Sequence, residues 1–363
     1  MPPSRFLPHS ALQSLIDVLA ASGYAVIAPQ AREGRIVYEE TFQTAELPWG
    51  ITLAQAAGNS RTTKGTHKQA FAWANGPQAL KPLLFAPREP LWRITRQTDG
   101  YAVEAIEPPG RPLAVIGVRA CDLAALRIQD RHFLGGPCPD PHYGGRREGM
   151  LLVAVNCTHP AATCFCASTG DGPEATADFD IALTELEDGF VIQAGSPEGE
   201  EILAALPLQE AQAGKIEAAA AGIRRAAESQ TRAIPGQNLR DALMARLDHG
   251  RWQEVAERCL ACGNCTMVCP TCFCHAETEQ PELDGSGSLH SREWDSCFGE
   301  RHGHIHGKQL RPEISQRYRQ WLTHKLASWH DQFGRSGCVG CGRCIAWCPV
   351  GIDITEEAAA LLK

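Results

Sequence analysis

The chain has 363 residues, of which 44% are hydrophobic and 21% charged, as in a soluble globular protein with room for two domains. Its net charge of −8 argues against nucleic acid or an anionic membrane as a partner. The N-terminal sequence lacks the charged segment and apolar core of a secretory signal. Apolar runs such as MLLVAV are too short to span a bilayer. We therefore expect a cytoplasmic protein without a membrane span.

Alternating helix and strand patterns predict an α/β domain over residues 1–215. Residues 9–22 have the pattern of a helix, and residues 113–118 that of a short buried strand. Apolar side chains recur at helical spacing over residues 121–134, and residues 150–157 again resemble a buried strand. This order of elements is typical of a sheet with covering helices.

The character of the chain changes after residue 215. Residues 216–240 are alanine-rich and amphipathic and end in PGQN, which predicts a helical linker. Residues 241–363 combine helical patterns, the longest at 311–333, with cysteine-rich loops. The expected fold class is thus an α/β N-terminal domain followed by an α-helical, cysteine-rich domain, α+β overall.

The sixteen cysteines indicate metal binding, because a dense disulfide framework is unusual in a reducing cytoplasm. The pattern C-x2-C-x2-C-x3-C-P occurs at residues 259–270 and again at 338–349. It is the ligand pattern of two-cluster ferredoxins, in which three thiolates hold one [4Fe-4S] cluster and the fourth reaches the other. We predict that Cys259, Cys262, Cys265 and Cys348 hold the first cluster, and that Cys338, Cys341, Cys344 and Cys269 hold the second. The α/β N-terminal domain is therefore expected to be followed by an α-helical two-cluster ferredoxin domain.

A structural zinc protein is the main alternative for these two runs. Zinc takes four tetrahedral ligands, usually from two C-x2-C pairs on separate loops. Three thiolates on one loop suit a cubane cluster better, and two complete copies of the pattern favour iron and sulfide.

The tetrapeptide TCFC also occurs twice, at residues 163–166 and 271–274. Cysteines near the first copy could bind a third cluster, and those near the second could form an additional site with a non-cysteine group or a partner. The alternative is that these side chains are small buried hydrophobes or free thiols. The first set is Cys121, Cys157, Cys164 and Cys166, the second is Cys272, Cys274 and Cys297, and Cys138 is expected to be an ordinary loop cysteine.

The chain shows neither a G-x-G-x-x-G nor a G-x4-G-K-[ST] pattern, the fingerprints of dinucleotide and nucleotide phosphate binding. Residues 168–173 are glycine-rich; a surface turn is the simpler interpretation, and a flavin is not excluded. We find no pairing of a nucleophile with a base, so the chain is not expected to be catalytic alone.

Several motifs, taken in order, resemble a known family. They are VIGVRACDLAALRIQDRHFL, NCTHPAATCFCASTGDGP, the two cysteine runs and REWDSC, which together cover roughly residues 110–354. They resemble the iron–sulfur beta subunit of soluble sulfhydrogenases, the NAD(P)-linked nickel–iron hydrogenases, and are similar to the electron-input subunit of anaerobic sulfite reductase. The resemblance implies an electron-transfer subunit that works beside a subunit with FAD and a nicotinamide site and a catalytic metal subunit.

Two other functions remain open from the sequence. The chain could deliver electrons to a sulfite reductase, which a neighbouring gene for a sirohaem subunit would indicate. Its first domain could instead bind flavin and act as an oxidoreductase subunit in its own right, which a flavin absorption band would reveal. In each case the clusters would exchange single electrons.

Overall fold

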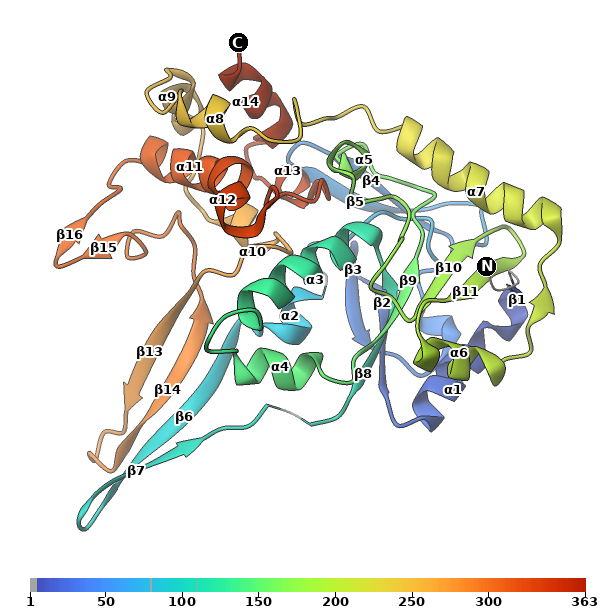
Figure 1. The fold of residues 1–363 in the computed structure, drawn as a ribbon, viewed down its shortest axis with the longest axis horizontal. Helices are drawn as coiled ribbons and strands as arrows, with labels where there is room; N and C mark the ends of the chain where they lie inside the picture. The colour runs from blue at the N-terminus through green and yellow to red at the C-terminus, as the bar shows by residue number, and fades with distance from the viewer. Residues whose placement is uncertain (1–4, 79, 109) are drawn as a thin grey trace.

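The computed structural model describes residues 5–78, 80–108 and 110–363. It combines sheets and helices, as the α+β class requires, and places the cysteine-rich segments beside the carboxyl ends of the sheet strands (Figure 1). Among the described residues, none of the helices combines the length and the apolar character needed to cross a membrane.

The N-terminal part is built on an eight-stranded sheet with the order β12-β1-β11-β10-β9-β8-β2-β3. Its four central neighbours, from β10 to β2, run parallel, and the outer strands pair antiparallel. Parallel strands are buried on both faces, which explains their continuous apolar sequences. The strands are β1 (Arg5–Pro8), β2 (Ala25–Arg32), β3 (Arg35–Glu40), β8 (Leu113–Val118), β9 (Leu151–Val155), β10 (Ile181–Glu185), β11 (Gly189–Ala194) and β12 (Gln209–Glu210).

Helices cover both faces of this sheet, and alternate residues of each strand serve the two cores. On β9, Leu151, Val153 and Val155 pack with one core and Leu152 with the other. The first core holds α1 (Leu12–Ala21) and α6 (Pro197–Ala204), which begins at the capping side chain of Ser196. The second core holds α2 (Lys81–Leu84), α3 (Ala120–Phe133) and α4 (Pro141–Arg147).

A long helix, α7 (Ala213–Glu228), leads to the C-terminal part. It begins slightly before the predicted linker and ends earlier, so residues 229–239 continue without a helix. The predicted helix at 311–333 is present as three consecutive helical segments, α11, η3 and α12. The helices of this part are α8 (Arg240–Met244), α9 (Arg251–Ala256), α10 (Asn264–Met267), α11 (Ile314–Thr323), the π-helical η3 (His324–Ser328), α12 (Trp329–Phe333), α13 (Arg343–Ala346) and α14 (Ile354–Leu361).

The C-terminal part is not wholly helical, which corrects the expectation from sequence. The hairpin β13 (His275–Pro281) and β14 (Gly287–Trp294) lies between the two cysteine runs. It pairs with β6 (Arg88–Gln97) and β7 (Gly100–Ala105) in the order β13-β14-β6-β7. The β13 strand is mostly polar and exposed, so it lacks the apolar alternation that identifies a strand. Only the turn residues of DGSGS signalled the hairpin.

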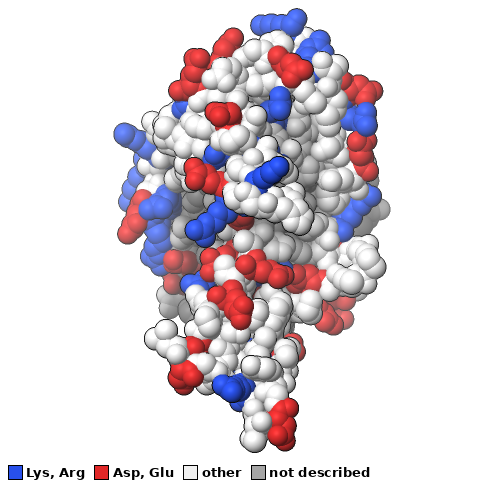
Figure 2. Space-filling view, turned by 90° about the vertical axis from the view of Figure 1, so that its left-hand side faces the viewer, with Lys and Arg blue, Asp and Glu red and all other residues white. Residues whose placement is uncertain are grey.

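This four-stranded sheet forms an arm that projects from the body of the molecule (Figure 1). Asp and Glu side chains gather on the face where the arm joins the body, and Lys and Arg side chains lie around them (Figure 2). The remaining elements are short: η1 (His9–Ala11), η2 (Thr44–Glu46), α5 (Cys166–Thr169), and the hairpins β4 (Ile51–Ala56) with β5 (Asn59–Lys64) and β15 (His304–Ile305) with β16 (Lys308–Gln309).

Candidate metal centres

The two cysteine runs fold into the same loop. Gly263 and Gly342 both have a φ of +73° and each directly precedes a short helix, α10 or α13, that carries the third cysteine of its run. Two residues earlier, Ala261 and Gly340 also have positive φ, at 49° and 63°. Left-handed residues at these two places curl the backbone around its own cysteines, and glycine adopts this conformation without a steric penalty.

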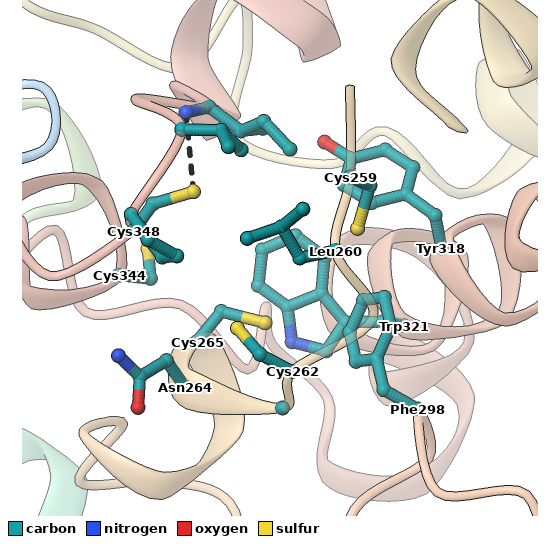
Figure 3. A pocket seen from close by; sticks show the side chains of 14 residues that line it. Cys259, Leu260, Cys262, Asn264, Cys265, Phe298, Tyr318, Trp321, Cys344 and Cys348 are labelled. Carbon is teal, nitrogen blue, oxygen red and sulfur yellow. Dashed lines mark hydrogen bonds between the residues drawn. The ribbon is translucent and has the colours of Figure 1, made fainter. Parts of the chain in front are cut away.

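The first predicted set of cysteines lines one cavity. Figure 3 shows the thiols of Cys259, Cys262 and Cys265 facing the same space as that of Cys348. The thiols stand around the cavity: in the described part of the chain, no three His, Cys, Asp or Glu side chains converge closely enough to hold a single metal ion. Aromatic side chains close the opposite wall, namely Phe298, Tyr318 and Trp321.

Backbone N–H groups point at two of these sulfurs. The amide of Ala261 donates to Cys259 Sγ at 3.4 Å. The amide of Ile352 donates to Cys348 Sγ at 3.3 Å, the dashed line in Figure 3. Such donors stabilise thiolate ligands and tune the potential of an iron–sulfur cluster. Burial raises the pKa of the Cys265 thiol well above its usual value, so binding a metal centre here would release protons.

The second predicted set is also brought together. Burial is the largest cause that raises the pKa of the Cys344 thiol, followed by the neighbouring thiols of Cys338, Cys341 and Cys269. Cys344 also lines the first cavity, so the two sets adjoin. The structure therefore places Cys348 with the first run and Cys269 with the second, although crossed ligation itself stays a prediction.

A buried lysine lies beside the second predicted set of cysteines. Lys325 Nζ lies 3.4 Å from Cys269 Sγ and 2.9 Å from Thr271 Oγ1. Hydrogen bonding with Cys272, followed by the charge of Lys325, lowers the pKa of the Cys269 thiol well below its usual value. Lys325 belongs to η3, and π-helical segments inside longer helices occur frequently at functional sites.

An ion pair fixes the second loop to the N-terminal part. Arg343 donates to both carboxylate oxygens of Asp122 in the first turn of α3, at 2.7 and 3.0 Å. The two side chains are 1% and 2% exposed. Around them, side chains of α3 pack with Trp329, Val339 and Cys341. The second set therefore lies between the two parts of the chain.

The set around the first TCFC copy converges as well, although its spacing along the chain is not a standard ligand run. Cys121, Cys157, Cys164 and Cys166 line a common cavity, together with Cys341 from the second loop.

The set around the second TCFC copy converges only in part. Cys274 is among the neighbours that raise the pKa of Cys297 after burial. Hydrogen bonds to Cys274 and Asp295 raise the pKa of His302 to about 9. Cys272 instead lies against Cys269. A further group held by these three cysteines stays a prediction, and Cys138 lies exposed outside every set.

Sequence reasoning missed the charged groups around the thiols. Lys325 lies within the apolar stretch of the 311–333 helix, where an unpaired lysine is unusual and is the only signal. Asp122 follows a cysteine and Arg343 lies inside the second run, but nothing in the sequence shows that these two residues meet.

The comparisons with known proteins agree with this geometry. A family model described as a 4Fe-4S dicluster domain matches residues 258–352. The chain is 32% identical to the sulfhydrogenase 2 subunit beta of Pyrococcus furiosus over 278 residues, which are 75% of this chain and 79% of that protein. No solved structure matches the chain. The chain therefore belongs to the family of sulfhydrogenase beta subunits and is an iron–sulfur electron-transfer subunit with a 4Fe-4S dicluster domain.

Proposed function

We propose that the chain relays single electrons through two [4Fe-4S] clusters, between a subunit that binds FAD and NAD(P) and a subunit with a catalytic metal. The observation that carries the proposal is the adjacency of two equivalent cysteine loops, which share Cys344 at their boundary. A cubane cluster exchanges one electron, whereas a flavin takes up a hydride and can pass on single electrons. Neighbouring clusters are thus suited to connect a flavin with a distant metal site.

The residues have distinct roles in this relay. Each loop supplies three thiolates and receives the fourth from the other run. Backbone amides of Ala261 and Ile352 donate to ligand sulfurs of the first set, and the ammonium group of Lys325 lies beside a ligand of the second. The ligands are Cys259, Cys262, Cys265 and Cys348 for the first cluster and Cys338, Cys341, Cys344 and Cys269 for the second.

The first loop is the side on which a partner could exchange electrons. Cys262 is exposed, and its neighbour Leu260 is 62% exposed. An apolar side chain beside an exposed ligand suits transient or permanent contact with another subunit. The similar Pyrococcus furiosus protein is itself named as a subunit, which supports a hetero-oligomer. All sixteen cysteines are free thiols in the structure, which fits a cytoplasmic location.

The test uses the complex isolated anaerobically through a tag on this chain. The Cys348→Ser variant should lose electron transfer between NAD(P)H and the terminal metal subunit, while each partner still reacts with an artificial dye. Cys138→Ser, which alters a cysteine outside every set, should behave as wild type. Full transfer by a Cys348→Ser complex that lacks the first cluster would refute the relay, and sirohaem in the complex would identify a sulfite reductase as the terminal partner.

The crossed arrangement has its own test in the same variants. Cys348→Ser should alter the paramagnetic signal that Cys262→Ser also alters, and leave the signal altered by Cys338→Ser unchanged. If Cys348→Ser changes only the signal that depends on Cys338, the fourth ligand comes from the same run and the crossing is wrong.

A further inference from the structure

We propose that Cys121, Cys157, Cys164 and Cys166 hold a third [4Fe-4S] cluster in the N-terminal part of the chain. The four side chains are buried and line one small cavity. The inference deepens the proposed relay and rests on it for the kind of metal centre. The site itself is inferred from the positions of the four cysteine side chains.

The sheet brings the first two cysteines together. β8 and β9 are parallel neighbours, so the segments after their carboxyl ends meet at one edge of the sheet. Cys121 lies in the first turn of α3 after β8, and Cys157 follows β9. Ligands in open α/β sheets bind at this edge. The loop with Cys164 and Cys166 closes the site from the side of the second cysteine run.

The wall of the cavity contains a buried positive charge, which an anionic group bound in the cavity would neutralise. Arg119 lines the cavity and is 2% exposed. Among the described residues, its terminal N–H groups donate to the backbone carbonyl oxygens of Phe71, Trp73 and Val155, and its guanidinium lies 4.3 Å from the centre of the Trp73 ring. Within the described part of the chain its Nε has no hydrogen-bond partner. A buried charge without a counter-charge is costly, and an iron–sulfur centre with four thiolates would supply that counter-charge.

Two amide side chains donate to sulfurs of the set. Gln230 Nε2 lies 3.4 Å from Cys166 Sγ, and Asn75 Nδ2 lies 3.9 Å from Cys164 Sγ. Hydrogen bonds of this kind surround the sulfurs of iron–sulfur centres and adjust their potential. Asn75 Nδ2 also donates to the carbonyl oxygen of Cys341 at 2.8 Å, so one side chain contacts both this set and the second loop.

The site directly adjoins the second predicted cluster. The amide of Phe165 donates to the carbonyl oxygen of Gly340 at 2.8 Å. A Cβ atom on Gly340 would come within 2.5 Å of the backbone of Cys166, so only glycine permits this approach. Cys341, a ligand predicted for the second cluster, lines the cavity itself. A third one-electron centre here would extend the path from the exposed first loop, past the second, into the sheet domain.

The arrangement of the four thiols favours a cluster over zinc. A structural zinc ion holds four sulfurs at about 2.3 Å from one point. The four thiols here line a cavity without converging on one point, since among the described residues no three His, Cys, Asp or Glu side chains come close enough to hold a single metal ion. Four cysteine ligands are also what a [4Fe-4S] cluster requires.

The experiment measures iron and acid-labile sulfide in the full chain, purified anaerobically. Cys157→Ser should lower the iron content by about four per chain relative to wild type, because a whole [4Fe-4S] cluster is lost. The two dicluster signals should remain, and Cys138→Ser should keep the full iron content. As a measurement independent of folding of the variant, spin counting on the fully reduced wild type should give at least three paramagnetic centres.

The outcomes separate this proposal from the relay. Two centres and about eight irons in wild type would refute the third cluster and leave the relay intact. Unchanged iron in Cys157→Ser, or zinc at the site, would likewise refute the third cluster. No paramagnetic centre at all would refute both proposals.

Discussion

The two cysteine runs share a sequence pattern and a backbone conformation, yet they lie in different surroundings. The first loop is near the surface, with Cys262 exposed, whereas Cys338 and Cys341 in the second loop are buried. A Cβ atom on Gly263 would approach the hydroxyl of Ser296 at 3.0 Å, but one on Gly342 would meet the carbonyl oxygen of Thr163 at 2.3 Å. The motif thus specifies the loop, and the rest of the chain specifies what surrounds it.

The difference has electrostatic consequences. The first cavity has an aromatic wall and backbone donors, whereas two buried cations, Lys325 and Arg343, lie beside the second set. Positive charge stabilises the reduced form of a cluster, because reduction adds negative charge. We therefore expect charged residues outside the cysteine motif to raise the reduction potential of the second cluster. Such residues should affect the reduction potential of the first cluster little.

The largest effect is expected from the ion pair that holds the second loop. Asp122→Ala would leave Arg343 buried without its partner, which typically costs about 3–5 kcal/mol. The measurement is denaturant unfolding of the anaerobic protein, followed by circular dichroism and cluster absorption.

Asp241→Ala is the matched control, since Asp241 pairs with Arg240 but its side chain is 91% exposed. An exposed pair contributes about 0–1 kcal/mol. If both variants unfold at the same denaturant concentration, the buried pair does not hold the two parts of the chain together.

Gly263 and Gly342 occupy equivalent positions in the two loops and have the same φ, so one substitution can be compared in two surroundings. Gly342→Ala and Gly263→Ala each place a side chain at a φ of +73°, which costs about 1–2 kcal/mol. Gly342→Ala also forces the loop away from Thr163, and such overpacking adds about 1–3 kcal/mol. Unfolding free energies should therefore fall by about 2–5 kcal/mol for Gly342→Ala and by about 1–2 kcal/mol for Gly263→Ala.

Iron content provides a second measurement on the same two variants. Gly342→Ala should lose iron from the buried site more readily than Gly263→Ala loses it from the exposed one. Equal losses in stability and iron would mean that the contact with Thr163 does not support the second loop.

The comparison also shows how far the sequence could predict this molecule. The cysteine spacing predicts that Cys259, Cys262 and Cys265 lie together, because they fall within seven residues, and all three line the first cavity. Their ligation of a cluster stays a prediction. The β13–β14 hairpin was not predicted, because β13 is mostly polar and β14 pairs with β6, which lies far away in the sequence. The contact of Lys325 with Cys269 spans 56 residues, and no local pattern reports such a contact.

Lys325 provides the most specific effect, a change in the reduction potential of one cluster. In Lys325→Met a buried positive charge next to Cys269 is lost, so the reduced second cluster is less stable and its potential should fall. A unit charge at roughly 6–8 Å contributes about 2–3 kcal/mol at an effective dielectric near 20. With about 59 mV per tenfold change for one electron, the expected drop is on the order of 100 mV.

A redox titration of both paramagnetic signals checks this prediction. Lys325→Arg keeps the charge and should keep most of the potential, and the first cluster should shift little in either variant. A shift confined to the first cluster would mean that Cys269 is a ligand of the first cluster, and the crossed arrangement would then be wrong. Equal shifts in both clusters would mean that Lys325 acts through the fold of the domain, since only a charge beside one cluster distinguishes the two.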